Sequence, residues 1–239
     1  MRQSPAFGVI FDMDGVLVDS AAPHLRSWEL LARENGGNVT REQFAGTFGC
    51  QNRDIIPLLF GPVSETRMRT LGDRKEQIYR ELIRDHPPIV DGAVSLIRGL
   101  HGAGAGLAVG SSGPRENIEL IVDTMGIADC VSAVVSADDV TRGKPDPQVF
   151  TLAADRLGVP PRRCVVIEDA PVGVQAARAA GMHSVAVLIY HPPSALQGAD
   201  RLVSCLADLT VEDVVTLARD DGMVHGNITR RVERENAGG

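Results

Sequence analysis

Two aspartates, Asp12 and Asp14, stand directly after a short apolar run at residues 7–11. An apolar run without alternation is typical of a strand that is covered on both faces of a parallel sheet. Side chains two residues apart in an extended chain point the same way, so both carboxylates are expected at the carboxyl end of this strand. Carboxylates this close repel each other, so the pair predicts either a bound proton or a cation between them.

The stretch has two other interpretations, an Asp-rich turn after a strand and a calcium-binding loop. A calcium loop of the EF-hand type needs a glycine in mid-loop and a bidentate glutamate at its end. Gly15 comes too early for that glycine, and Pro23 stands where the glutamate would be. The turn and the cation site remain as alternatives, and the rest of the chain must decide between them.

Further polar side chains stand where other apolar runs end, or before a helix that leads into such a run: Ser111, Lys144, Glu168 and Asp169. In a doubly wound sheet the carboxyl ends of the strands lie along one edge, so these groups would converge with the two aspartates. Several negatively charged oxygens suit Mg²⁺, a hard cation that keeps water ligands and favours phosphate as a co-ligand. Ser111 and the amides of the following helix start can hold phosphoryl oxygens, and Lys144 supplies a compact positive charge to the same group.

Taken singly, each of these residues has a purely structural explanation. Ser111 can cap a helix, and Lys144 can be a solvated loop charge. Glu168 and Asp169 can cap the helix that follows them. Their common placement at one edge of the predicted sheet favours a functional site.

The elements that must position these groups are apolar runs that alternate with helical patterns. The runs lie at 7–11, 106–110, 132–136, 164–167 and 184–189. Strands that alternate with helices predict an α/β fold with a doubly wound, right-handed parallel sheet.

A helical block interrupts this alternation. The sequence has no strand-like run between residues 18 and 87, and Pro87-Pro88 marks the end of the block. We therefore expect an α/β core domain at 1–17 and 88–225, an inserted small α-helical domain at 18–87, and a disordered tail at 226–239.

The composition excludes several classes of function. The chain has 239 residues, 44% of them hydrophobic, and a net charge of −7, an ordinary balance for a soluble α/β protein. Nucleic acid would need a basic stripe, which the sequence lacks, so no nucleic-acid partner is expected. The four cysteines are scattered without CxxC pairing, and the sequence shows neither a signal peptide nor a bilayer-length apolar run. We therefore expect a cytoplasmic monomer or weak dimer without a membrane partner.

Four segments match the motifs of a known family: FDMDGVLVDS at 11–20, VGSS at 109–112, GKPDP at 143–147 and VIEDAPVGVQAA at 166–177. On these segments the chain resembles the haloacid dehalogenase superfamily, in the subgroup that includes β-phosphoglucomutase and sugar-phosphate phosphatases. The motifs occur in the family's order over most of the chain. They are therefore specific for the superfamily, but not for a substrate.

The resemblance implies roles for the acidic residues. Asp12 would be the nucleophile that takes the phosphoryl group as an aspartyl phosphate. Asp14 would protonate the leaving oxygen and later deprotonate the attacking water. Mg²⁺ would be held by the Asp12 carboxylate, the backbone carbonyl of Asp14 and Asp169. Glu168 would lie in the coordination shell or next to it.

The resemblance also implies how the phosphoryl group and the substrate are held. Ser111, Ser112 and Lys144 would hold the phosphoryl group, which is charge stabilisation at fixed positions. The helical block at 18–87 would be a cap that closes over the site and excludes water. Four residues of this block are candidates for contacting the substrate: His24, Asn52, Arg53 and Lys75.

We expect a Mg²⁺-dependent phosphatase that acts on a small phosphorylated metabolite, with a sugar phosphate as the leading class, through an aspartyl phosphate. The alternative is a phosphosugar mutase of the β-phosphoglucomutase type, in which a second sugar hydroxyl accepts the phosphoryl group instead of water. A catalytically idle sensor or scaffold would be marked by the loss of Asp12, Asp14 or Lys144, and the sequence retains all three.

Overall fold

The computed structural model describes residues 5–45, 47 and 50–219. The expected disordered tail at 226–239 lies outside the described residues, as does the end of the expected core domain after residue 219. Within the described residues, no helix is both long and apolar enough to cross a membrane.

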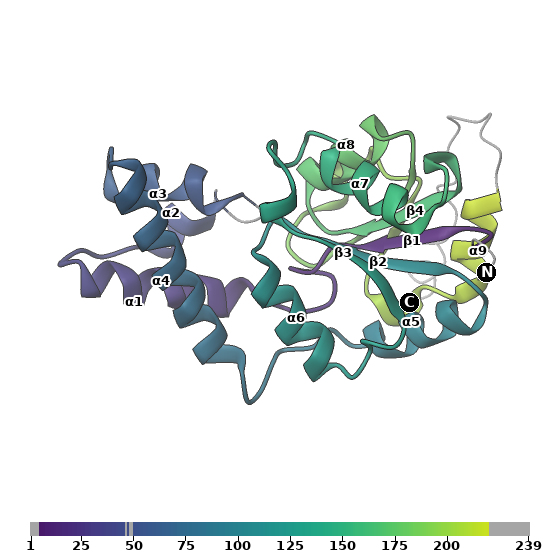
Figure 1. The fold of residues 1–239 in the computed structure, drawn as a ribbon, viewed down its shortest axis with the longest axis horizontal. Coiled ribbons are helices and arrows are strands. Elements are labelled where there is room, and N and C mark those ends of the chain that lie inside the picture. The colour runs from purple at the N-terminus through teal and green to yellow at the C-terminus, as the bar shows by residue number, and fades with distance from the viewer. Residues whose placement is uncertain (1–4, 46, 48–49, 220–239) are drawn as a thin grey trace, which may run out of the picture.

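Six strands of the described chain form one sheet, in which every neighbouring pair is parallel (Figure 1). The strands are β1 (Gly8–Phe11), β2 (Gly106–Gly110), β3 (Val131–Val135), β4 (Cys164–Glu168), β5 (His183–Val187) and β6 (Arg201–Val203). Their order across the sheet is β3-β2-β1-β4-β5-β6, so β1 lies in the middle between β2 and β4. The expected α/β fold with a doubly wound parallel sheet is confirmed.

The side chains of β1 alternate between the two faces of the sheet. Val9 and Phe11 belong to an apolar cluster that includes residues of α5 (Ala93–Gly102), α6 (Arg115–Thr124) and α9 (Val211–Arg219). Ile10 belongs to a second cluster, with residues of α7 (Gln148–Leu157) and α8 (Pro171–Ala179). Figure 1 shows α7 and α8 on one side of the sheet and α5 and α6 on the other. Because both faces are covered, the apolar run of β1 does not alternate with polar residues.

Several short elements of the core are not predicted by the sequence. Strand β6 has three residues and pairs with β5 at Val185 to Val187. A run this short, with an arginine in it, carries no periodicity, so only its pairing defines it as a strand. The connecting loops also contain short 3₁₀ helices: Ala137–Asp139, Pro161–Arg163, Pro193–Ala195 and Leu206–Asp208.

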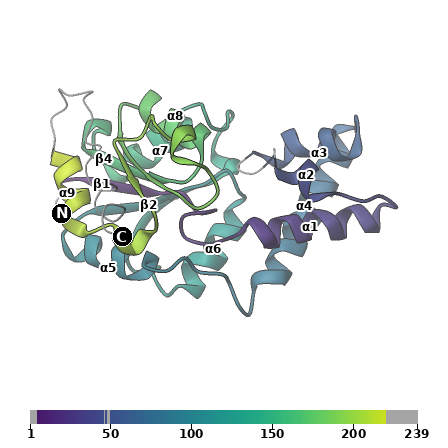
Figure 2. The same cartoon turned by 180° about the vertical axis from the view of Figure 1, so that it is seen from behind.

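A block of helices, called the cap below, lies beyond the end of the sheet at which β1 ends (Figures 1 and 2). Its helices are α1 (Ala21–Glu34), α2 (Arg41–Ala45), α3 (Asn52–Phe60) and α4 (Glu65–Ile83). They share an apolar cluster of their own, whose buried members include Trp28, Leu31, Phe44, Ile56 and Leu71. The cap therefore has a core that is distinct from the two apolar clusters of the sheet.

Two short segments connect the cap to the sheet, and they pair with each other. The amide of Asp19 donates to the carbonyl of Pro88 at 2.8 Å, and the amide of Val90 donates to the carbonyl of Leu17 at 3.0 Å. The chain thus enters and leaves the cap at neighbouring points. The proposed domain boundaries at 18 and 87 fall in this paired region.

Candidate active site

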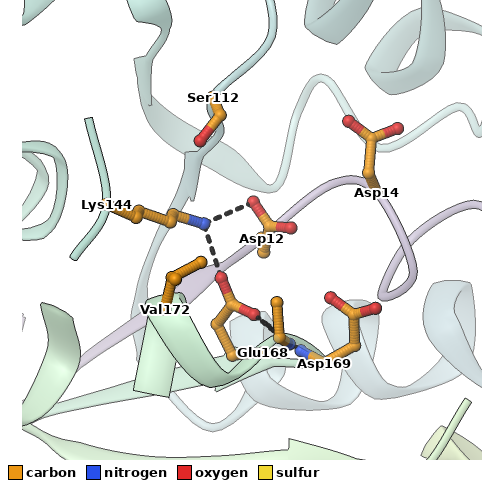
Figure 3. Close-up of a pocket in the computed structure, with 8 residues that line it drawn as sticks. Asp12, Asp14, Ser112, Lys144, Glu168, Asp169 and Val172 are labelled. Atoms are coloured by element: carbon orange, nitrogen blue, oxygen red, sulfur yellow. Dashed lines mark hydrogen bonds and ion pairs between the residues drawn. The ribbon is translucent and has the colours of Figure 1, made fainter. Parts of the chain in front are cut away.

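A small cavity lies where β1 and β4 end. It is lined by Asp12, Asp14, Ser112, Lys144, Glu168, Asp169, Ala170 and Val172 (Figure 3). The loop after β1 reaches this position because Gly15 has a φ of +76°. A Cβ at Gly15 would lie 2.1 Å from Oδ2 of Asp169, so a side chain at this position would collide with that carboxylate.

Lys144 joins the ends of β1 and β4. Its Nζ donates to Oδ1 of Asp12 at 2.8 Å and to Oε1 of Glu168 at 2.6 Å, and Figure 3 shows it reaching between the two carboxylates. It also lies 4.8 Å from the centre of the Phe150 ring. Burial by itself would lower the pKa of Lys144, but the charges of Asp12 and Glu168 raise it above its ordinary value. Lys144 therefore carries its positive charge inside the protein.

Glu168 has both carboxylate oxygens engaged by protein donors. Oε1 accepts from Lys144, and Oε2 accepts from the amides of Asp169 and Ala170, each at 2.7 Å. A Cβ at Gly173 would lie 1.8 Å from Oε1 of Glu168, so α8 can begin against this carboxylate only with glycine there. These contacts favour a place for Glu168 beside a metal shell, where it holds Lys144, over a place as a direct ligand.

The carboxylates at this edge of the sheet form an oxygen-rich group that suits a hard cation. Oxygens of Asp12, Glu168 and Asp169 lie within 4.8 Å of one another. Oδ2 of Asp169 is buried and has no hydrogen-bond partner among the described residues. Burial, together with the charges of Glu168 and Asp12, raises the pKa of Asp169 well above its ordinary value. An oxygen-only set with one orphaned buried acceptor fits Mg²⁺.

Asp12 is also buried, with a relative exposure of 7%. Burial raises its pKa to about 7; Lys144 opposes this rise, and Glu168 and Asp14 add to it. One ammonium cannot balance the neighbouring carboxylates, so Lys144 keeps its proton while the acids are driven toward their neutral forms. A divalent cation beside them would reverse this tendency and keep Asp12 ionised.

Asp14 is held by the cap. Nε2 of His24, on α1, lies 3.0 Å from Oδ1 of Asp14, and Nδ1 of His24 lies 2.8 Å from Nζ of Lys75, on α4. The His24 ring stacks on Tyr79 with the ring centres 4.0 Å apart. Burial would raise the pKa of Asp14, but the charge and the hydrogen bond of His24 more than offset it, so the pKa lies below its ordinary value. The structure thus places one of the four cap candidates, His24, against Asp14 and a second, Lys75, against His24.

The other two cap candidates contact the protein elsewhere. Nδ2 of Asn52 donates to Oε1 of Glu76 at 2.8 Å. Both terminal nitrogens of Arg53, an exposed side chain, lie 3.4 Å from the carbonyl of Thr141 on the core. Neither Asn52 nor Arg53 is among the described residues that line the cavity.

The two candidate serines differ in their surroundings. Ser112 lines the cavity, whereas Ser111 is buried and outside the described lining. Oγ of Ser111 accepts from the amide of Gly113 at 3.0 Å, and its amide donates to Val135 at 3.0 Å. Ser111 is thus built into the turn before α6, and its hydroxyl hydrogen is still able to donate.

Two residues of this region escape the sequence analysis. Glu76 accepts from Nζ of Lys75 at 2.8 Å and from Nδ2 of Asn117, a buried residue of α6, at 2.6 Å. A signal for this buried cluster exists in the sequence, because Lys75 stands four residues after Leu71 and four before Tyr79, on the apolar stripe of α4. A charged residue on such a stripe predicts a buried partner of opposite charge.

With this geometry in place, comparison with known proteins identifies the family. The model of the haloacid dehalogenase-like hydrolases matches residues 8–181. The chain belongs to this family, as its four motifs predicted, and it is therefore a member of a hydrolase family.

Several relatives have names that describe phosphate chemistry. The fructose-1-phosphate phosphatase of Escherichia coli is 33% identical over 75% of this chain and 95% of its own. The β-phosphoglucomutase of Bacillus subtilis is 32% identical over 85% of this chain and 92% of its own. A chloroplastic 5-amino-6-(5-phospho-D-ribitylamino)uracil phosphatase of Arabidopsis thaliana is 32% identical over 90% of this chain, which spans only 58% of that longer relative. The named phosphatases support an enzyme that hydrolyses phosphoric monoesters.

The fold is also similar to solved structures. A crystal structure of β-phosphoglucomutase from Clostridium difficile has a TM-score of 0.80 and 25% identity, over 88% of this chain and 96% of the other. The expected family and fold are thus confirmed, and phosphatases and mutases both occur among the relatives.

Proposed function

We propose that this chain is a Mg²⁺-dependent phosphatase that hydrolyses a small phosphorylated metabolite, with sugar phosphates as the leading class, through an aspartyl phosphate on Asp12. The observation that carries the proposal is the position of Asp12. Its buried carboxylate faces the ammonium of Lys144, and Asp14 lines the same cavity. A nucleophile, a fixed positive charge and an acid–base group are the parts that phosphoryl transfer requires.

In the first step an Asp12 oxygen attacks phosphorus, and the bond from phosphorus to the leaving oxygen breaks. Asp14 gives a proton to that oxygen. In the second step Asp14 takes a proton from water, the water oxygen attacks phosphorus, and the bond to Asp12 breaks, which releases inorganic phosphate. The lowered pKa of Asp14 suits the second step, since the carboxylate form is the base.

The protein groups around Asp12 stabilise the charge of the transferring group. Lys144 faces the developing charge, and Ser112 lines the cavity, where it can donate to a phosphoryl oxygen. Asp12, the Asp14 carbonyl and Asp169 would hold a Mg²⁺ ion, which would supply further positive charge to the phosphoryl group. Glu168 keeps Lys144 in place.

The alternative function is a phosphosugar mutase, which the similarity to two β-phosphoglucomutases favours. A mutase that works through a bisphosphate needs a cation for the second phosphate. Lys75 is buried and paired with Glu76 at 2.8 Å, and Arg53 lies against the carbonyl of Thr141. Neither Lys75 nor Arg53 is among the described residues that line the cavity, so we propose water as the acceptor.

The test is to follow two products in one reaction. The protein is given a panel of sugar monophosphates with Mg²⁺ or with a chelator, and free phosphate is measured. β-Glucose 1-phosphate with a bisphosphate primer is added as a separate arm, and glucose 6-phosphate is measured. We expect Mg²⁺-dependent phosphate release and no isomer. Glucose 6-phosphate that forms much faster than free phosphate would establish the mutase instead.

The finer expectations about the setting of the enzyme remain proposals. Scattered free cysteines support a cytoplasmic location, and Cys130 and Cys164 are buried in the described structure. The negative net charge gives no reason to propose nucleic acid as a partner, and the proposed partner is the small phosphorylated metabolite. A monomer or weak dimer is proposed for the oligomeric state.

A further inference from the structure

A chain of polar side chains, partly buried at Asp14 and His24 and buried beyond them, runs from the cavity through the cap and back to the core. It begins at Asp14, passes through His24 and Lys75, and reaches Glu76. Each step is a contact of 2.8 to 3.0 Å between side-chain atoms. From Glu76 the chain continues to Asn117, so it returns to the core in the first turn of α6.

Glu76 is the junction of this chain. Its Oε1 accepts from Lys75 and Asn52, each at 2.8 Å, and its Oε2 accepts from Asn117 at 2.6 Å. These donors come from α4, α3 and α6, so one carboxylate joins two cap helices to a helix of the core. Burial would raise the pKa of Glu76, but the charges of Lys75 and His24 hold it below its ordinary value.

Asn117 is the core side of the junction. It is fully buried, and both polar atoms of its side chain contact the cap. Nδ2 donates to Glu76, and Oδ1 accepts from Arg80 at 2.9 Å. Helix α6 follows the turn that contains Ser111 and Ser112. The contact therefore links the cap to the same part of the core that carries the proposed phosphoryl-binding turn.

Lys75 is buried beside this junction. Its side chain is 3% exposed, and its Nζ lies 5.2 Å from the centre of the Trp28 ring and 5.4 Å from that of Tyr79. A buried ammonium among aromatic rings requires a paired anion, and Glu76 is the carboxylate in contact with it. If Glu76 lost its charge, Lys75 would lose the partner that holds it against His24.

We propose that Glu76 and Asn117 are positioning residues for the acid–base step: they form a latch between cap and core that keeps Lys75 and His24 aligned on Asp14. This inference rests on the proposed phosphatase function. Neither Glu76 nor Asn117 is among the described residues that line the cavity. The effect of the latch should therefore appear where Asp14 must deliver a proton and be small where no proton is needed.

The experiment compares leaving groups. Glu76→Gln and Asn117→Ala are assayed for kcat/KM with the best sugar phosphate of the panel above, whose leaving alkoxide needs a proton. They are also assayed with p-nitrophenyl phosphate and acetyl phosphate, whose leaving groups depart as stable anions. The constant kcat/KM reports the step in which the leaving group departs. The matched control is Glu81→Gln, an exposed glutamate of the same helix.

We expect both latch variants to lower kcat/KM for the sugar phosphate by about tenfold or more, a part of the 10²–10⁴ that general acid catalysis supplies. The activated phosphates should change by less than about threefold, and Glu81→Gln should change neither, since it leaves the latch intact. Thermal unfolding checks that each variant folds. Should Glu76→Gln not fold, Asn117→Ala carries the comparison, because it keeps the charge pair of Lys75 and Glu76.

Two results would overturn the latch. An equal loss with both classes of substrate would mean a general structural role, and no loss with either would mean that the contact is dispensable. A wild type that releases no phosphate from any of these compounds is a different result, since it would overturn the proposed function itself.

Discussion

Two buried clusters, each built around one lysine, lie on either side of Asp14. In the cluster at the sheet edge, Lys144 stands against the carboxylates of Asp12, Glu168 and Asp169, and an oxygen of Asp169 is without a partner in the described structure. In the cap cluster, Lys75 contacts Glu76. The two carboxylate oxygens of Glu76 accept hydrogen bonds from Lys75, Asn52 and Asn117.

The difference between the clusters lies in their charge balance. The sheet-edge cluster has an excess of negative charge, which raises the pKa of Asp12 and Asp169. The cap cluster is balanced, and the pKa of Glu76 lies below its ordinary value. An excess of negative charge suits a cation, whereas a balanced cluster holds only its own members in place.

The strongest way to break this comparison is to remove the nucleophile. Asp12→Asn is nearly isosteric, so the fold should persist, but a neutral amide neither attacks phosphorus nor binds Mg²⁺ well. We expect phosphate release to fall by more than about a hundredfold, a rise in the barrier of about 3 kcal/mol. Phosphate release is measured at saturating Mg²⁺, with a circular dichroism spectrum to check folding. A variant that keeps more activity than this would show that another group is the nucleophile.

The second change tests the orphaned oxygen. Asp169→Asn keeps the volume but removes the negative charge of the proposed ligand, so more Mg²⁺ should be needed for half-maximal activity. Loss of a group that only orients a metal ligand lowers the metal affinity by about 10 to 100-fold, so loss of the ligand itself should lower it by at least about tenfold. Activity is titrated with Mg²⁺ in wild type and variant. An unchanged titration, or activity that survives a strong chelator, would remove the metal from the proposal.

The third change tests whether Glu168 must be held against Lys144. Gly173→Ala places a Cβ 1.8 Å from Oε1 of Glu168, which must then move away from Lys144. We expect kcat/KM to fall by about tenfold, since the fixed charge beside Asp12 is displaced. Gly102→Ala at the end of α5, where a Cβ meets nothing within 4 Å, is the control. It should keep full activity and gain up to about 1 kcal/mol in stability. Full activity in Gly173→Ala would mean that the Glu168 carboxylate need not be held in this position.

The smallest effect concerns pH and stability. The pKa of Asp12 is raised from 3.8 to about 7, so between these values the folded state binds more protons than the unfolded state. Without a divalent cation, stability should therefore fall as the pH rises through this range. Mg²⁺ binds the ionised form and removes the penalty, so it should raise the Tm more at pH 8 than at pH 5, by about 2 to 4 °C for each kcal/mol.

Thermal unfolding with Mg²⁺ or a chelator across this pH range measures the effect. The Asp169→Asn variant is the control, since its Tm should respond less to Mg²⁺. A response to Mg²⁺ that is the same at both pH values would contradict the raised pKa of Asp12.

Much of the core could be predicted from the sequence, because its signals are local. The apolar run of β1 and its direct continuation into Asp12 and Asp14 mark a buried strand whose end carries acids. Once parallel strands are predicted, their carboxyl ends must share one edge, which brings Glu168 and Asp169 to the same place. The fold class and the family followed from these segments.

The tertiary structure decided which side chains are left without a partner. Glu168 and Asp169 are adjacent in sequence, yet the first is held by Lys144 and two amides, while the second keeps a bare oxygen. Both residues stand at the end of β4, so the sequence pattern does not show which of them keeps an oxygen without a partner. The way α8 begins against Glu168, through Gly173, makes the difference.

The cap cluster depended even more on tertiary packing. His24, Lys75 and Asn117 lie on different helices, and nothing in their spacing states that these helices meet. A helical pattern predicts which face is apolar, but the partner of that face depends on how the helices pack in three dimensions. The sequence by itself therefore determined the fold class, the family and the acids at the sheet edge, whereas the contacts that hold Asp14 exist only because α1, α4 and α6 pack together.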